Sequence, residues 1–203
     1  MLPLKLEVTD ESSVAAAFAT IATHFPDGVD ILINNAGSFQ SFLQPLSSAH
    51  TTKWWTDFEV NVKGAMLVTK YFLSQANHSS SETGAGQRPK QKHIIYLSSA
   101  AGLLVHEGSS AYSITKLADV QLAAYAAAEN RDQSLHVVAV HPGIVRTDMM
   151  IDAFAPFAKD TPELAGAVIN WATTDQAQFL NGRFITVNVS VFTLPQAGIV
   201  YRD

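Results

Sequence analysis

Short apolar runs alternate along the chain with segments whose apolar positions recur at helical spacing. The runs Val29–Ile33, His93–Leu97 and Leu135–Val140 have the length of strands. The strongest candidate is Val29–Ile33, a continuous apolar run that is typical of a strand buried on both faces of a parallel sheet. Arg183–Val189 alternates instead, and we predict it to be the final strand of the same sheet.

Four segments have the apolar periodicity of helices that cover such a sheet. They are Glu11–Phe25, with Asp10 as its expected N-cap, Thr51–Ala76, the alanine-rich Ala111–Asn130, and Pro162–Thr174 with proline near its first turn. Because the helical segments fall between the strand segments, they predict βαβ units.

The order of these elements defines the expected architecture. Strands that alternate with helices indicate a mostly parallel sheet with right-handed crossovers. Residues 1–203 contain no internal repeat and no clear linker, so we expect one α/β domain. The Ser- and Gly-containing segment His78–Lys92 is predicted to be an exposed, enlarged loop.

Composition narrows the classes of function. Hydrophobic residues make up 47% of the chain and charged residues 15%, values of a compact protein rather than a disordered one. The net charge of −5 without a basic stripe argues against nucleic acid as a partner. The absence of cysteine excludes disulfides and thiolate metal sites, and we expect no metal centre. Without a secretory pattern or an apolar run of about 20 residues, no membrane association is expected, and we place the protein in the cytoplasm.

Polar motifs follow the predicted strands, at the edge where open α/β sheets bind ligands. They are Asn34–Gly37 after the first strand, Asn61 on the next helix, Ser98 and Ser99 after the second strand, Tyr112 and Lys116 in the helix beyond, and His141–Thr147 after the third strand. Each motif alone is common in ordinary turns and helices. Their joint occurrence in this order is what points to a site.

Tyr112 and Lys116 suit acid–base chemistry. Residues four apart share a helix face, so both side chains can meet one ligand. A tyrosine phenol ionises only near pH 10, but a neighbouring ammonium favours its phenolate. Ser99 at a strand end can donate a hydrogen bond to an oxygen on which negative charge develops. Such a set fits interconversion of a carbonyl and an alcohol.

Together these motifs, with Ser99 placed 13 residues before Tyr112, resemble the short-chain dehydrogenase/reductase family. The resemblance implies a Rossmann-like, doubly wound parallel sheet, and it selects Ser99 over Ser98. It implies that Tyr112 is the general acid/base and that Ser99 orients and polarises the substrate carbonyl. Lys116 would bind the nicotinamide ribose and stabilise the tyrosine phenolate, while Asn61 would support a proton-relay water.

The same resemblance implies further contacts with a nicotinamide cofactor. We expect Glu7 to contact the adenine and Asn35 to lie near the adenosine ribose. Val145 and Thr147 would contact the nicotinamide carboxamide. The remaining expected cofactor-binding residues are Lys70, Tyr112 and Lys116. Glu7 begins a segment that resembles the family's DVTD motif, with Glu in place of Asp. By analogy with reductive members we expect NADP, with NAD as the alternative.

The chain departs from the family pattern at its beginning. Members open with a strand, the glycine-rich turn TGxxxGxG, a helix and further strands, whereas the glycines of this sequence begin at Gly28. We therefore expect the N-terminal strands and the glycine-rich loop to be missing, with Leu4–Val8 as the remaining end of one strand. The strand Val29–Ile33 would then have an open, apolar edge.

The leading hypothesis is an NAD(P)-dependent oxidoreductase that interconverts a ketone and a secondary alcohol. The alternative is a non-catalytic relative that acts as an interaction or regulatory subunit; an epimerase or dehydratase using the same tyrosine and lysine is a third reading. We expect a small carbonyl or alcohol substrate, bound through Leu103–Gly108 and Thr147–Thr161. By family analogy, a homo-oligomer is expected.

Overall fold

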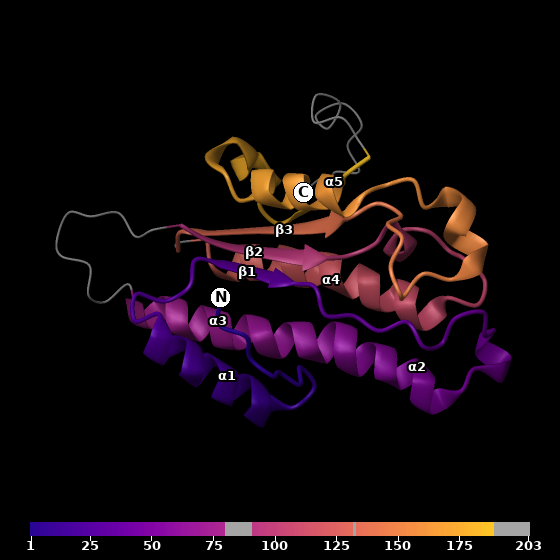
Figure 1. Ribbon diagram of the computed structural model, residues 1–203, viewed down its shortest axis with the longest axis horizontal. Helices are drawn as coiled ribbons and strands as arrows, with labels where there is room; N and C mark the ends of the chain where they lie inside the picture. Colours follow the sequence, from indigo (N-terminus) through magenta and orange to yellow (C-terminus); the bar gives the residue numbers. More distant parts are fainter. Residues whose placement is uncertain (80–90, 132, 189–203) are drawn as a thin grey trace.

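The computed structural model describes residues 1–79, 91–131 and 133–188. At its centre lies a parallel sheet with the strand order β1-β2-β3-β4 (Figure 1). Its strands are β1 (Ile31–Asn34), β2 (Lys92–Leu97), β3 (Leu135–His141) and β4 (Arg183–Thr186). The expected Rossmann-like α/β class is confirmed.

Helices cover both faces of the sheet. Their bounds are α1 (Glu11–His24), α2 (Thr51–Phe58), α3 (Ala65–Ser79), α4 (Ser110–Glu129) and α5 (Pro162–Ala172). A π-helical turn, η2 (Glu59–Gly64), joins α2 to α3, so the predicted helix from Thr51 is continuous but locally widened. Asp10 caps α1 as expected, because its side chain accepts a hydrogen bond from the Ser12 amide.

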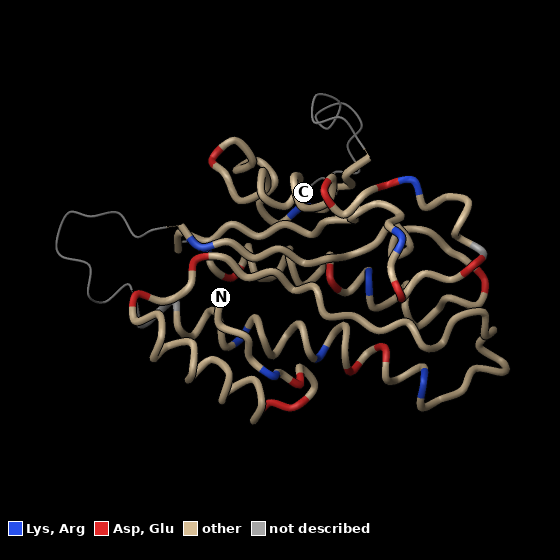
Figure 2. Tube along the Cα trace, in the orientation of Figure 1, with Lys and Arg blue, Asp and Glu red and all other residues tan. Residues whose placement is uncertain are grey.

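The central strands have apolar residues on both sides. Ile94 and Val137 face the cluster formed with α1, α3 and α4, whereas Ile95 and Val138 face the cluster formed with α5. All four side chains are fully buried. Figure 2 shows these strands free of charged residues along most of their length. Two-sided burial therefore belongs to β2 and β3. The same prediction for Val29–Ile33 is wrong, because Ile31 and Ile33 of the edge strand β1 are exposed.

The last crossover differs from the prediction. The connections from β1 to β2 and from β2 to β3 run over the face covered by α3 and α4, whereas α5 lies on the opposite face (Figure 1). Each strand is added to the same side of the sheet as the one before it, so the first two connections and the third move in the same direction along the sheet. Because the third connection passes over the opposite face, it has the reverse hand of the first two. The long segment 142–161 carries the chain across the end of the sheet before α5 begins.

Some predicted bounds are also corrected. Leu4–Val8 forms no strand, and Leu4 and Leu6 are 37% and 39% exposed, because no described strand lies beside them. The last strand ends at Thr186 rather than Val189, which lies outside the described residues. Most of the predicted loop His78–Lys92 is also outside the described residues, and β2 already begins at Lys92.

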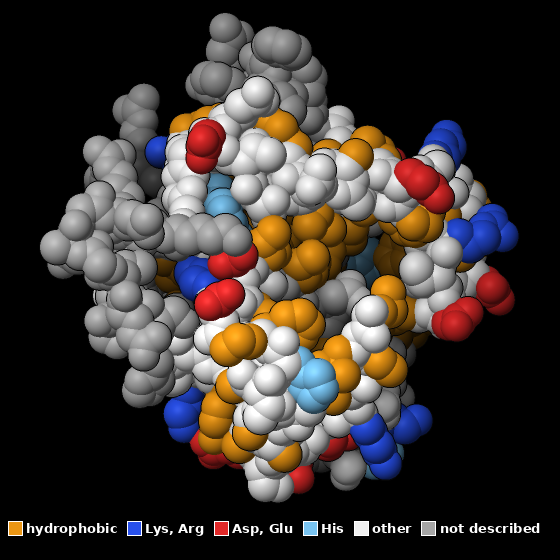
Figure 3. Space-filling view, turned by 60° about the vertical axis from the view of Figure 1, so that its left-hand side comes forward, with side chains coloured by type: hydrophobic (Ala, Val, Ile, Leu, Met, Phe, Trp, Pro, Cys, Tyr) orange, Lys and Arg blue, Asp and Glu red, His pale blue; other side chains and the backbone are white. Residues whose placement is uncertain are grey.

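The open edge expected at β1 is confirmed. Within the described chain β1 pairs only with β2, and Ile31 and Ile33 are 48% and 47% exposed. In Figure 3, hydrophobic side chains gather in a hollow between the upper and lower parts of the molecule. No helix among the described residues is long and apolar enough to cross a membrane.

Candidate active site

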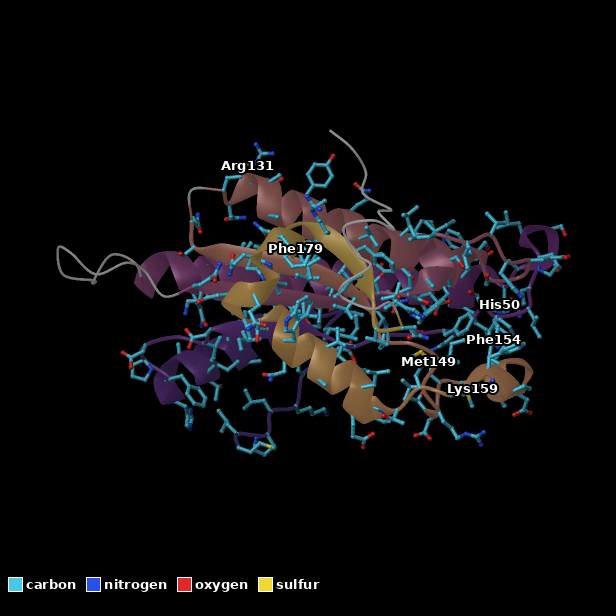
Figure 4. All side chains as sticks on the ribbon, turned by 90° about the horizontal axis from the view of Figure 1, so that it is seen from above. His50, Arg131, Met149, Phe154, Lys159 and Phe179 are labelled. Atoms are coloured by element: carbon cyan, nitrogen blue, oxygen red, sulfur yellow. The ribbon has the colours of Figure 1, made fainter. Side chains whose placement is uncertain are left out.

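The polar motifs meet at one end of the sheet because all four strands point the same way (Figure 1). This is the end at which parallel sheets bind ligands. The segment after β3 folds over it, and Figure 4 places Met149, Phe154 and Lys159 there together with His50. The site is therefore built from chain segments that are far apart in the sequence.

Two neighbouring serines at the end of β2 have different roles. Ser98 is 3% exposed, and its hydroxyl donates a hydrogen bond of 2.6 Å to the Lys116 carbonyl oxygen. Ser99 is only half-buried, and its Oγ accepts a 3.2 Å bond from the Ala101 amide. The hydroxyl hydrogen of Ser99 has no acceptor among the described residues. Ser98 thus fastens α4 to the sheet, while Ser99 keeps a free donor.

A close approach of two backbones sets the position of Ser99 relative to α4. Ser99 caps the single turn η3 (Ala100–Gly102), which lies against α4. A Cβ atom at Gly102 would lie 2.7 Å from the Leu117 nitrogen and 2.8 Å from the Lys116 carbonyl carbon. Only glycine leaves room for this contact. The sequence analysis did not single out Gly102, because the contact involves residues 14 and 15 positions away.

Tyr112 lies in the first turn of α4, and its ring is held from one side. The Phe39 ring stacks on it, with centroids 4.2 Å apart and an interplanar angle of 28°. The Tyr112 hydroxyl forms no hydrogen bond with any described residue and the side chain is half-buried. The ring is thus oriented by packing, while the phenol oxygen is left for a ligand.

Lys116 lies one turn further along the same helix face and is 6% exposed. Its Nζ donates to the Leu97 carbonyl oxygen at 2.7 Å and to Asp119 Oδ2 at 3.0 Å. The same Nζ lies 5.7 Å from the centroid of the Tyr112 ring. Since an ammonium has three donors, one N–H remains for a ligand. The predicted proximity of Tyr112 and Lys116 is therefore present.

Asn61 lies in the π-helical turn and is 1% exposed. Its Nδ2 donates to the Ser38 carbonyl oxygen at 3.0 Å and to Thr115 Oγ1 at 2.9 Å, while its Oδ1 accepts from the Ser38 amide at 2.6 Å. Thr115 Oγ1 in turn donates to the Tyr112 carbonyl oxygen at 2.7 Å. Asn61 therefore joins the loop after β1 to the first turns of α4.

A buried carboxylate that the sequence analysis missed supports the same loop. Asp57 is fully buried and accepts hydrogen bonds from the hydroxyls of Ser38 and Ser41 and from the amides of Gln40 and Ser41. These bonds fix the backbone on both sides of Phe39, and hence the ring that stacks on Tyr112. The available signal was spacing, because Asp57 precedes Asn61 by four residues and shares its helix face.

Asn35, Val145 and Thr147 lie at the same end of the sheet. Asn35 follows β1 and is exposed. Val145 follows β3 and forms an isolated bridge with Asp160. Thr147 is also exposed, and its carbonyl oxygen accepts a hydrogen bond from the Met150 amide. No described contact joins them to Tyr112 or Lys116, so their contacts with a cofactor stay a prediction.

Glu7 and Lys70 are not brought to this cluster. Glu7 is exposed beside α1, where hydrogen bonds from the Thr9 amide and hydroxyl lower the pKa of its carboxyl. Lys70 lies on the outer side of α3 and pairs with Glu11 of α1 at 2.7 Å, which raises the pKa of its ammonium. In the described structure, Lys70 therefore links two helices.

The two segments expected to bind substrate do approach each other. The Phe154 ring lies 6.0 Å from that of Phe42 and 5.9 Å from that of His106. The loop after β1 also contacts the 103–108 segment, because the Gln44 amide donates to the Gly108 carbonyl oxygen at 3.2 Å. Aromatic side chains thus line the approach to the Phe39–Tyr112 pair.

The remaining titratable groups near the strand ends do not form a metal site. His141 ends β3, and burial lowers the pKa of its imidazole. Across residues 1–79, 91–131 and 133–188, no group of three His, Asp or Glu side chains could hold a metal ion.

With this geometry in view, the comparison with known proteins decides the family. The family model for short chain dehydrogenase matches residues 1–156. The chain belongs to the short-chain dehydrogenase family. A relative from Monascus purpureus, short chain dehydrogenase mpl6, is 33% identical over 198 residues, which are 96% of this chain and 63% of the relative. The chain thus spans less than two-thirds of that relative's length.

Solved structures of the family share the fold. The 3-ketoacyl-(acyl-carrier-protein) reductase of Brucella melitensis, complexed with NADH, superposes with a TM-score of 0.80 over 92% of this chain and 76% of its own, at 21% identity. ElxO with NADP bound gives a TM-score of 0.74 over 90% of this chain and 74% of its own, at 26% identity.

The residues of this family member fit one end of a nicotinamide cofactor. The free N–H of Lys116 and the unpaired Tyr112 hydroxyl lie together at the carboxyl ends of the strands and suit a ribose. The diphosphate end is different, because residues 1–203 contain no TGxxxGxG turn. Gly143 has a positive φ of 81°, but the Asp160 carboxylate faces it, and this negative charge does not suit a phosphate.

Proposed function

We propose that this protein is an NAD(P)-dependent oxidoreductase that interconverts a ketone and a secondary alcohol. The observation that carries the proposal is the joint geometry of Ser99, Tyr112 and Lys116: two free hydroxyl groups and a buried ammonium at the ligand-binding end of the sheet. A bound, reduced nicotinamide would supply a hydride to the carbonyl carbon. The preference for NADP is supported by the similarity to ElxO, which was solved with NADP.

In the direction of reduction, the protein must stabilise and protonate the carbonyl oxygen. Ser99 donates its free O–H to that oxygen as negative charge develops there. Tyr112 then transfers its phenolic proton to the oxygen as hydride arrives at the carbon, which leaves the alcohol and a phenolate. Lys116 stabilises this phenolate, and its remaining N–H would hold the nicotinamide ribose. In the oxidation direction the same phenolate accepts the alcohol proton.

Asn61 has a more limited role in this scheme than the family resemblance implies. Both hydrogens of its Nδ2 are already used by Ser38 and Thr115. A relay water could therefore bond only to its backbone carbonyl or to the second lone pair of Oδ1. We propose that the side chain of Asn61 mainly positions α4, and with it Tyr112.

The test is the replacement Tyr112→Phe, assayed with NADPH and a panel of aliphatic and cyclic ketones. Removal of one hydroxyl should lower turnover by at least about 100-fold, the usual contribution of a general acid. The far-UV circular dichroism should be unchanged, because the ring and its stacking on Phe39 are retained. Undiminished turnover in Tyr112→Phe would remove the role of Tyr112.

A second candidate function is favoured by the exposed edge of β1. Ile31 and Ile33 leave an apolar strand edge that can pair with another chain, as in an interaction or regulatory subunit. Saturable binding of NADPH by the purified chain, followed by cofactor fluorescence, distinguishes the two candidates. Binding in the micromolar range supports the oxidoreductase, and its absence favours the interaction subunit.

A further inference from the structure

Aromatic side chains gather next to the proposed acid, Tyr112, and the proton transfer itself makes no use of them. The Phe39 ring stacks on Tyr112, with centroids 4.2 Å apart. Phe42 meets the Phe39 ring edge-on, with centroids 4.8 Å apart and an interplanar angle of 77°. Phe154 lies 6.0 Å from Phe42, and His106 lies 5.9 Å from Phe154. A row of rings therefore leads away from the Tyr112 phenol.

These rings come from three segments of the chain: the loop after β1, the loop before α4 and the segment after β3. Close approaches bring the three segments together. A Cβ atom at Gly108 would lie 2.8 Å from Leu43 Cα. A Cβ atom at Gly37 would lie 3.7 Å from Met149 Cε. Figure 4 shows Met149 and Phe154 at this end of the molecule, so the rings border the site that holds Tyr112.

The three segments carry apolar surface and almost no charge. Residues 39–46 contain no charged residue, while 103–108 and 149–157 contain one each, Glu107 and Asp152, both exposed. Apolar side chains of these segments that are at least 43% exposed are Leu43, Leu46, Leu104, Val105, Met149 and Phe157. Exposed apolar surface next to a polar site is typical of a pocket for an apolar ligand. The surface therefore suits an uncharged substrate with a large apolar group.

We propose that the substrate is an aryl ketone, whose carbonyl oxygen lies at Ser99 and Tyr112 and whose aromatic ring lies against Phe42 and Phe154. The inference rests on the proposed function. It adds a substrate class, and it makes Phe42 a residue that determines specificity.

The two ends of such a substrate have different partners. The free hydroxyl groups of Ser99 and Tyr112 fix the carbonyl end. Phe39 already uses its ring to stack on Tyr112, and it forms a wall beside the phenol. Phe42 and Phe154 are half-buried, and their contacts with other described rings are all tilted or edge-on, at 60° to 77°. Each can therefore still accept an offset-stacked ring from a ligand.

An aromatic substituent gains more from these neighbours than a saturated one of the same size. Both bury apolar area, which stabilises the complex in either case. Only the aromatic ring has a negative face and a positive edge, which match the faces and edges of the neighbouring rings. We therefore expect an aryl ketone to be favoured over its saturated analogue by about 2- to 10-fold.

The experiment compares two substrates that differ in the saturation of one ring, acetophenone and cyclohexyl methyl ketone. The ratio of their kcat/KM values with NADPH is measured in the parent chain and in Phe42→Leu. Because the intrinsic reactivity of each ketone is the same in both proteins, a change in this ratio reports on the protein. The preference for acetophenone should fall by about 2- to 10-fold in Phe42→Leu, through KM. Phe42→Tyr keeps the ring and should retain the preference of the parent.

A matched control removes a phenylalanine ring elsewhere. Phe179 is 47% exposed, its ring contacts that of Trp171 at 6.3 Å, and Figure 4 shows it away from Met149 and Phe154. Phe179→Leu should leave the ratio where it is in the parent. An unchanged ratio in Phe42→Leu, or an equal fall in Phe179→Leu, would overturn the proposal. Phe154→Leu, with the same expected fall, replaces Phe42→Leu if the latter does not fold.

A binding measurement covers the case in which the chain turns over neither ketone. Saturation-transfer NMR, without cofactor, gives the affinity of the parent chain for each ketone. Tighter binding of acetophenone, lost in Phe42→Leu, supports the aromatic site, and equal affinities for the two ketones would overturn it. Failure of the inference is distinct from failure of the proposed function: the former leaves turnover of both ketones dependent on Tyr112, whereas the latter removes that dependence.

Discussion

Two lysine–carboxylate pairs in this molecule have similar geometry and opposite surroundings. Lys116 and Asp119 are 3.0 Å apart, with side chains 7% and 4% exposed. Lys70 and Glu11 are 2.7 Å apart, with side chains 56% and 51% exposed. Burial raises the pKa of Asp119 to about 6, whereas the hydrogen bond from Lys70 lowers the pKa of Glu11. The carboxyl with the shorter contact lies on the surface, so distance does not decide the outcome.

The difference shows that burial decides how an ion pair affects the pKa of its carboxyl and the stability of the fold. Removing two charges from water costs several kcal/mol per ion, and the attraction between them roughly offsets that cost. On the surface, both the cost and the gain are small, since water and salt screen the pair. A buried pair is therefore a sensitive part of the structure, and here it lies next to Tyr112.

The largest expected effect comes from breaking the buried pair with Lys116→Met. The variant leaves Asp119 without its partner, which should lower the free energy of unfolding by about 3–5 kcal/mol at pH 8. At pH 5 the loss should be clearly smaller, because Asp119 then takes up a proton and no charge is left uncompensated. Urea unfolding at the two pH values measures the difference, and an equal loss at both would contradict it.

In the parent chain, the titration of Asp119 should also make the free energy of unfolding depend on pH. Because the folded-state pKa of Asp119 lies above the unfolded value of about 3.9, its contribution to stability is fully present below about pH 4. That contribution is lost as the pH rises through about 6. Asp119→Asn removes this component from the pH dependence of unfolding, and it serves as the control for Lys116→Met.

An intermediate effect is expected from Asp57→Ala. Asp57 has no lysine partner in the described structure, yet its four hydrogen bonds satisfy it within the loop after β1. Its loss leaves donors of Ser38, Gln40 and Ser41 unpaired and should cost about 2–3 kcal/mol in the free energy of unfolding. Because Phe39 would also lose its support, the ketone turnover should fall. The exposed Asp27→Ala is the control, and an equally small effect of both variants would disprove the role of Asp57.

The smallest effect is expected from Lys70→Met. Its pair with Glu11 is more than half exposed, so the urea midpoint should not differ measurably from that of the parent, at low or at high salt. The same variant tests the cofactor role that the family resemblance implies for Lys70. If the NADPH affinity is unchanged, Lys70 only links α1 and α3; a weaker affinity would restore the cofactor role.

The sequence analysis succeeded where the signal is local. Short apolar runs predicted the positions of β1, β2 and β3, although the burial on both faces that was expected of β1 is found at β2 and β3 instead. The four-residue spacing of Tyr112 and Lys116 predicted a shared helix face, and the structure shows it. The failures concern features that depend on distant neighbours. Leu4–Val8 has strand-like residues, but no described strand lies beside it, and the hand of the last crossover depends on the path of residues 142–161.

The choice between Ser98 and Ser99 shows the same limit. Sequence alone presents two adjacent serines, and only the family spacing favours the second. In the structure, Ser98 is buried against the Lys116 carbonyl and Ser99 keeps its donor free. The sequence around Asp57 and Asp119 does not indicate that their carboxylates are buried either, since an acidic residue in a helix is usually solvated.

By itself the sequence determined the α/β class and the family, and it predicted Ser99, Tyr112 and Lys116 as the site residues, because periodicity and short spacings are properties of the chain alone. Tertiary structure decided which of these groups are dehydrated and what lies beside them. It placed Gly102 against α4, Phe39 against Tyr112 and Asp119 against Lys116. The physical reason is that the charge and proton affinity of a side chain depend on its surroundings, and those surroundings come from residues distant in the sequence.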